Sequence, residues 1–172
     1  MASAQITLMP FTPRSALFHD AVHVFTETWN RDHLDAINFM RKHATYANFY
    51  GLTAHVDGEV AGMGFGTRSE PGQWWHDLVA AQVGPEHPAL QHAWVLTELA
   101  VIPAFRGKGI GGRIHDMLLA EQGFPRVLLS TNHDNPVARR MYEERGWTYL
   151  HPGFAFTPGD RPFVVMHQEL QP

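Results

Sequence analysis

The residues best suited to chemistry lie in one short stretch, VIPAFRGKGIGGRIH, at positions 101–115. Four glycines and three basic residues crowd into it: Arg106, Gly107, Lys108, Gly109, Gly111, Gly112 and Arg113. Glycine leaves backbone N–H groups uncovered, and the first N–H groups of a helix have no intrahelical partner. An apolar strand precedes the loop, and the pattern predicts a helix from about Gly109 to Glu121. A strand, a glycine loop and a helix in this order are typical of a phosphate site.

The spacing of the glycines narrows the kind of phosphate ligand. Lys108 is followed by Gly109 rather than by Ser or Thr, which excludes a P-loop. The pattern Gly107-x-Gly109-x-x-Gly112 fits a dinucleotide fingerprint, with Asp134 as its ribose-binding acid. However, the residues PAFR separate the strand from the glycines, and the strand follows an apparent antiparallel hairpin. Both features argue against a nicotinamide site. A tight turn without a ligand is the remaining structural alternative.

A second motif follows as NPVARRMYEERGW, residues 135–147. The first motif combines an apolar strand, Val-x-Pro and Arg106-x-x-Gly109-x-Gly111 at the start of a helix. In this order the two motifs resemble those of the GNAT superfamily of N-acetyltransferases, over about residues 93–150. Asn135, Ala138, Tyr142 and Gly146-Trp147 stand at the offsets of that family's second motif.

The resemblance implies that acetyl-CoA is the acetyl donor and that its pyrophosphate lies on the glycine loop. It implies that backbone groups of Leu99 and Val101 pair with the pantetheine arm. It also implies that Tyr142 gives a proton to the leaving thiolate. The implied cofactor-binding residues are Leu99, Val101, Arg106, Gly107, Lys108, Gly109, Ile110, Gly111, Gly112, Asn135 and Ala138. The alternatives are that Asn135 only caps a helix before Pro136 and that Tyr142 only packs at the edge of the core.

An amine acceptor needs a base, because an alkyl amine of pKa about 10.4 is mostly protonated at pH 7. Some members of the family carry a glutamate six residues before the valine of Val-x-Pro. Val95 occupies that position here, so the nearby Glu98 is the candidate base. Glu98 as a strand carboxylate that holds an arginine is the alternative. The other candidate bases are His55, His76 and His133.

Residues 69–92, SEPGQWWHDLVAAQVGPEHPALQH, are predicted to be an insertion between the hairpin and the central strand. Such long connections are usually functional or disordered, and exposing Trp74, Trp75, Leu78 and Val79 would be costly. We expect one short helix here, with Trp74, Trp75 and His76 forming a wall of the acceptor site. A helix that only covers the sheet edge is the alternative.

The remaining pattern predicts the scaffold. A strand is expected at Gln5–Met9, a helix capped by Ser15 that ends near Trp29, and a second helix capped by Asp32. Asp57-Gly58 predicts a hairpin turn. Later strands and helices alternate. The expected fold class is α/β (α+β), a single GNAT-like domain over residues 1–172 with a central mixed, mostly antiparallel sheet flanked by helices.

Composition limits the function further. The chain has 172 residues, no cysteine and a net charge of −4, so disulfides and thiol catalysis are excluded and no basic field recruits nucleic acid. His19 and His23 have metal-ligand spacing but lack a third ligand, so no metal is expected. No apolar run approaches the roughly 20 residues of a membrane span, and the N-terminus lacks a signal-peptide pattern.

The sequence therefore predicts a cytoplasmic N-acetyltransferase that uses acetyl-CoA and a small-molecule or peptide amine acceptor. It predicts no membrane partner, and the closing strands offer a surface for a homodimer. A non-catalytic acyl-CoA-binding or sensing module is the alternative function.

Overall fold

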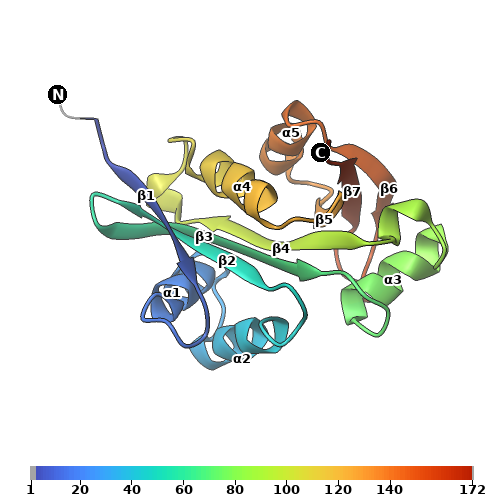
Figure 1. Ribbon diagram of the computed structural model, residues 1–172, viewed down its shortest axis with the longest axis horizontal. Coiled ribbons are helices and arrows are strands. Elements are labelled where there is room, and N and C mark those ends of the chain that lie inside the picture. Colours follow the sequence, from blue (N-terminus) through green and yellow to red (C-terminus); the bar gives the residue numbers. More distant parts are fainter. Residues whose placement is uncertain (1–2, 172) are drawn as a thin grey trace. The chain divides into compact units, whose positions relative to one another are not determined.

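A computed structural model describes residues 3–171, which form seven strands and five α-helices (Figure 1). The elements are β1 (Ile6–Phe11), α1 (Phe18–Trp29), α2 (His33–His43), β2 (Tyr50–Val56), β3 (Glu59–Arg68), α3 (Trp74–Val83), β4 (Ala93–Val101), α4 (Ile110–Glu121), β5 (Arg126–Asn132), α5 (Pro136–Glu144), β6 (Thr148–Phe154) and β7 (Phe163–Glu169), with 3₁₀ turns at Pro88–Leu90 and Pro103–Phe105. The strand order is β1-β2-β3-β4-β5-β7-β6. β4 and β5 pair in parallel, whereas β1–β2, β2–β3, β5–β7 and β6–β7 pair antiparallel. The mixed, mostly antiparallel sheet flanked by helices is confirmed.

The chain divides into two compact units, and β4 contributes residues to each. The first unit contains the described residues up to Thr67 together with Leu96–Gly123. The second contains Arg68–Val95 and the described residues from Phe124 onward. The glycine loop and Glu98 belong to the first unit. The second motif and the insertion belong to the second.

In the first unit, α1 and α2 lie on one face of the strands and α4 lies on the other (Figure 1). Aromatic and aliphatic side chains of α1, α2 and the strands form one buried cluster, which includes Phe18, Phe25, Met40, Phe65 and Ala100. On the opposite face, a Cβ atom at Gly64 would lie only 2.9 Å from Ile114 and Leu118 of α4. The missing side chain at Gly64 therefore lets α4 approach β3 closely.

In the second unit, α3 and the Pro88–Leu90 turn pack against β4, β5 and β7. Their buried cluster consists of Val79, Ala80, Ala89, Leu90, Ala93, Val95, Leu128 and Val165. Val127 and Leu129 are buried too, and strand alternation directs them to the other face from Leu128. The insertion is thus a packed part of the unit, and its one α-helix matches the expectation.

Local details of the N-terminal segment differ from the expectation. Ser15 does not cap α1: its hydroxyl donates to the Thr12 carbonyl and accepts from the Thr12 N–H, which closes a turn ahead of the helix. α1 begins at Phe18 without a side-chain cap. β1 continues through Pro10, which is tolerated because β1 is an edge strand whose register pairs Pro10 with Leu52. Across residues 3–171, no helix is both long and apolar enough to cross a membrane.

Candidate active site

The glycine loop enters α4 through two residues in the left-handed backbone region. Gly107 and Gly109 have φ angles of 77° and 76°, and a Cβ atom at either would meet no heavy atom within 4 Å. Gly109 is the N-cap of α4 and has no side chain to bond the first N–H groups of the helix. Ile110 is buried and anchors that first turn. The loop therefore presents backbone donors toward open space, as an anion site requires.

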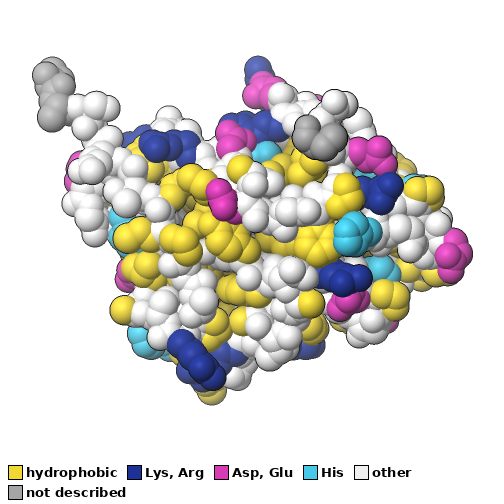
Figure 2. Space-filling model, in the orientation of Figure 1, with side chains coloured by type: hydrophobic (Ala, Val, Ile, Leu, Met, Phe, Trp, Pro, Cys, Tyr) yellow, Lys and Arg dark blue, Asp and Glu magenta, His cyan; other side chains and the backbone are white. Residues whose placement is uncertain are grey.

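Basic side chains surround this loop. Figure 2 shows Lys and Arg side chains gathered over the segment that leads into α4. Arg106 donates its Nε–H to the Val101 carbonyl at 3.1 Å, which ties the loop to the end of β4. Lys108 places its Nζ 5.4 Å from the centre of the Phe105 ring, a cation–π contact. Positive charge is thus held beside the N-terminus of α4, where the helix dipole has the same sign.

Glu98 lies on β4, on the face that carries Ala100 and looks toward α1, since alternate strand residues share a face. The indole Nε1–H of Trp29 donates to Glu98 Oε1 at 2.9 Å. The residue is half-buried, and the removal of its carboxyl from water raises the pKa of Glu98 to about 7. Hydrogen bonds from Trp29 and from the Leu99 backbone, together with the charge of Arg31, oppose this increase. Leu99 and Val101 are half-buried and alternate to the other face.

The junction between α1 and α2 positions Trp29 and Arg31. Trp29 ends α1, and Asn30 takes the left-handed conformation with a φ of 50° that closes the helix. Asp32 then caps α2 by accepting from the N–H groups of Leu34 and Asp35, as the sequence predicts. Arg31 is therefore held between two defined helix ends.

The second motif starts α5 in the second unit. The Asn135 side chain accepts from the Ala138 N–H at 3.1 Å, so its capping role is confirmed. Tyr142 is 7% exposed, and its ring packs edge-to-face on Trp147 with 5.9 Å between centroids. Gly146 has a φ of 89° just after the helix end. These contacts explain the local fold and leave the cofactor roles of Asn135, Ala138 and Tyr142 as predictions.

The three insertion residues that were predicted to form an acceptor wall differ in environment. Trp74 is 57% exposed and meets Phe156 edge-to-face. Trp75 packs against the cluster of the second unit and donates its Nε1–H to Ser130 Oγ at 2.9 Å. His76 is buried, with Nδ1 2.8 Å from Ser69 Oγ. Only Trp74 presents a largely free surface, so an acceptor role for the wall is a prediction that rests chiefly on Trp74.

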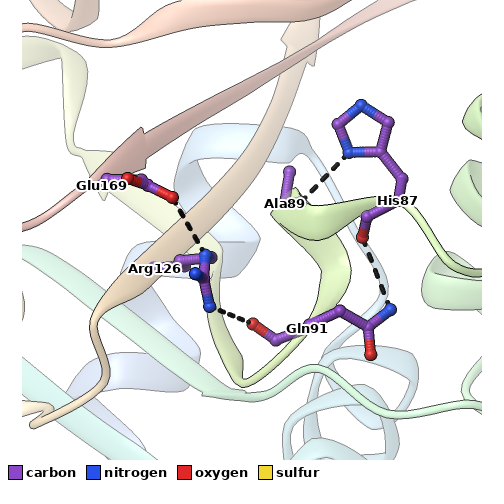
Figure 3. Close-up of polar contacts among 5 residues, drawn as sticks. All are labelled: His87, Ala89, Gln91, Arg126 and Glu169. Atoms are coloured by element: carbon purple, nitrogen blue, oxygen red, sulfur yellow. Dashed lines mark hydrogen bonds and ion pairs between the residues drawn. The ribbon is translucent and has the colours of Figure 1, made fainter.

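The end of the insertion is fastened to the strands through Arg126, as Figure 3 shows. Arg126 donates to the Gln91 carbonyl at 3.0 Å and to Glu169 at 3.1 Å. Gln91 in turn donates to the His87 carbonyl, and His87 Nδ1 accepts from the Ala89 N–H. Residues 87–91 are therefore held in a fixed turn.

The other histidine candidates lie in different settings. His55 is buried, with Nε2 3.1 Å from Asp20 of α1. His133 is exposed and lies 3.4 Å from Asp134. His19 and His23 are both exposed on α1, and residues 3–171 contain no group of three potential metal ligands.

Trp29 and Arg31 were missed as site residues. The sequence placed Trp29 only near the end of the first helix, yet the residue is 47% exposed and its N–H reaches a carboxylate 69 positions later. No local pattern in the sequence links the two residues. An aromatic residue beside a helix end, followed by an arginine and a capping aspartate, was the nearest available signal.

Comparison with known proteins agrees with this geometry. The model of the Acetyltransferase (GNAT) family matches residues 14–147. A GCN5-like protein acetyltransferase of Mycobacterium tuberculosis is 32% identical over 121 residues, which cover 64% of this chain and 59% of that protein. The chain thus matches less than two thirds of the relative's length.

Solved structures share the fold at low sequence identity. An acetyltransferase of the GNAT family from Bacillus cereus has a TM-score of 0.71 and 10% identity, covering 98% of this chain and 99% of that one. A Pyrococcus horikoshii protein has a TM-score of 0.69 and 15% identity, covering 97% and 99%. Because the family model matches most of this chain, the chain belongs to the GNAT family of acetyltransferases.

Proposed function

We propose that this protein is an acetyl-CoA-dependent N-acetyltransferase in which Glu98 is the general base. The observation that carries the proposal is the Glu98 carboxyl, whose pKa is raised to about 7 on the strand that leads into the glycine loop. An ordinary exposed glutamate is too weak a base to take a proton from an ammonium group efficiently. A carboxyl with a pKa near the working pH combines ionisation with a useful proton affinity.

The residues of the loop fit the pyrophosphate of acetyl-CoA. Gly107 and Gly109 leave open space where side chains would stand, and the α4 N-terminus supplies backbone donors. Arg106 and Lys108 add positive charge, and Gly111 and Gly112 keep the first turn of α4 free of bulky side chains. The bound molecule would supply the activated acetyl thioester.

Several roles in the proposal come from the resemblance alone. Backbone groups of Leu99 and Val101 would hold the pantetheine arm, with Asn135 and Ala138 as further cofactor contacts. Tyr142 would give its phenolic proton to the departing thiolate. The packing of Tyr142 on Trp147 supports this role, because it fixes the ring in one orientation.

The acceptor is proposed to be an amine on a small molecule or a peptide. The relative from Mycobacterium tuberculosis is named a protein acetyltransferase, which supports the peptide class. Trp74, Trp75 and His76 are retained as a proposed acceptor wall. The family model spans residues of both units, which supports the proposal that residues 1–172 act as one domain. A cytoplasmic location and a homodimer remain predictions.

The test is release of free CoA thiol from acetyl-CoA with a panel of amines, including lysine-containing and free N-terminal peptides. We expect acceptor-dependent release that rises with pH through about 7 and falls at least roughly 10²-fold in Glu98→Gln. Binding of acetyl-CoA by calorimetry with no release for any amine would contradict the proposal and favour the acyl-CoA-binding module. Binding of NADH instead would favour the dinucleotide alternative.

A further inference from the structure

We infer that Trp29 is a positioning residue for Glu98: its indole N–H holds Oε1 and so fixes the orientation of the carboxylate that takes the proton. The inference rests on the proposed function of Glu98 and assigns a role to a side chain outside the sequence motifs.

The bond between the two residues is well formed. Nε1 of Trp29 lies 2.9 Å from Oε1, within the range of a charge-assisted hydrogen bond. Trp has a single polar atom, which donates and never accepts, so it can bond an ionised carboxylate but cannot receive the proton of a neutral one. The contact therefore favours the ionised form of Glu98, which is the form that acts as a base.

The exposure of Trp29 argues against a purely structural role. Trp29 is 47% exposed, although the apolar residues Phe18, Val22 and Phe25 of the same helix are buried. A tryptophan kept only for packing would bury more of its ring. The helix-ending turn at Asn30 and the Asp32 cap fix the backbone on the C-terminal side of Trp29, so the indole is held in place by the fold.

The charges around Glu98 are few. Arg31 is the charged side chain whose field lowers the pKa of Glu98, and β4 carries no second ionisable residue. The ionisable residues on the neighbouring α1, β3 and the start of α2 are His19, Asp20, His23, Glu27, Asp32, His33, Asp35, Glu59 and Arg68. Because burial raises the pKa while Trp29 and Arg31 lower it, loss of the indole donor must raise it further.

The test is Trp29→Phe, which keeps an aromatic ring and removes the donor. The pH at which kcat/KM reaches half its maximum should rise by about 0.5–1 unit, and kcat at pH 7 should fall about two- to fivefold, as the ionised fraction of Glu98 falls. The KM for acetyl-CoA should stay within about twofold. Leu34→Ala, which truncates a 63% exposed side chain in the first turn of α2, is the matched control and should leave the midpoint unchanged.

A direct titration separates this inference from the proposed function. The carboxyl of Glu98 is followed by NMR in protein labelled with ¹³C at the glutamate carboxyl, with Glu98→Gln to assign the signal. A higher midpoint in Trp29→Phe supports the inference even if no amine is acetylated, in which case only the proposed function fails. An unchanged midpoint in the folded variant overturns the inference, whether or not the wild-type protein is active.

Discussion

Ser69 and His76 form a buried pair at the start of the insertion, with 2.8 Å between Ser69 Oγ and His76 Nδ1. Ser69 also donates its backbone N–H to the Ala93 carbonyl, so the pair connects α3 to the beginning of β4. Burial lowers the pKa of His76 below its ordinary value, while Asp77 and Glu70 partly oppose the decrease. His76 is therefore neutral in the folded protein near pH 7.

This relationship predicts a pH dependence of stability. As the pH falls through 6.5, the unfolded chain takes up a proton at residue 76 before the folded protein does, so the free energy of unfolding decreases. His76→Asn keeps a polar atom near the place of Nδ1 and cannot ionise. Urea unfolding from pH 7.5 to 5.5 should therefore show a smaller loss of stability in His76→Asn than in the wild-type protein.

Part of the dependence should persist in that variant, because burial also lowers the pKa of His43 and His167. His133→Asn is the control, since His133 is exposed, and it should keep the wild-type slope. Equal slopes in the wild-type protein and His76→Asn would show that His76 does not couple protonation to folding.

Glu98→Gln should lower the activity and raise the stability of the protein at alkaline pH. The pKa of Glu98 is about 7 in the folded protein, against an ordinary 4.5, so the folded state binds the extra proton between these values. The free energy of unfolding of the wild-type protein therefore decreases as the pH rises from 4.5 through 7, because the buried carboxyl must ionise. At pH 8 the glutamine variant should be more stable by about 1–3 kcal/mol, and at pH 4 the two should agree. Thermal unfolding at both pH values measures the difference. If Glu98→Gln is no more stable than the wild-type protein at pH 8, burial does not raise the pKa of Glu98.

The glycine loop is tested with a matched pair of substitutions. Gly107 and Gly159 both have positive φ, 77° and 88°, and a Cβ atom at either meets nothing within 4 Å. Valine at either position should therefore cost similar stability, about 1–2 kcal/mol from backbone strain. Only Gly107→Val should weaken acetyl-CoA binding, by at least roughly tenfold, because the side chain blocks the anion. Calorimetry decides, and equal affinities in both folded variants would remove the loop from the proposed cofactor site.

The sequence was most informative where local chemistry decides the structure. The mostly apolar segment AWVLTELAV forms β4 just before Ile102-Pro103, and Asp57 at a φ of 50° with Gly58 at 87° forms the expected turn. Asp32 caps α2 because a short carboxylate bonds the next N–H groups wherever a helix starts. The prediction that Ser15 caps the first helix was wrong, because its hydroxyl bonds the Thr12 backbone instead of a helix N–H.

Long-range relationships were beyond the sequence. Glu98 was a candidate through its strand position, but its raised pKa depends on burial, and the Trp29 donor that partly opposes the increase is far away in the chain. The two adjacent tryptophans of the insertion, Trp74 and Trp75, lie in different settings, because neighbouring residues of a helix face different ways. Which one would pack inward depended on Ser130, a strand residue 55 positions from Trp75.

Tyr142→Phe isolates the proposed proton donor. Phenylalanine keeps the ring on Trp147, while the phenolic proton is lost. Turnover should fall by about 10²-fold or more with acetyl-CoA affinity nearly intact. Tyr149→Phe is the control: it removes a hydroxyl that bonds Arg139 and Glu143 on the surface and should leave turnover unchanged. Full turnover in Tyr142→Phe would return that residue to a packing role.

Alanine substitutions of Trp74 and Trp75 should have different effects, one on acceptor kinetics and the other on stability. Trp75→Ala removes a ring from the cluster of the second unit and leaves Ser130 without its indole donor, so unfolding should become easier by roughly 2–4 kcal/mol. Trp74→Ala removes a largely exposed ring and should cost little stability. If the insertion forms the acceptor wall, Trp74→Ala should lower kcat/KM for the acceptor while acetyl-CoA affinity stays within about twofold. Steady-state kinetics over several amines, alongside urea unfolding of both variants, checks this. A Trp74→Ala enzyme that treats every acceptor like the wild-type protein would leave the insertion with a structural role alone.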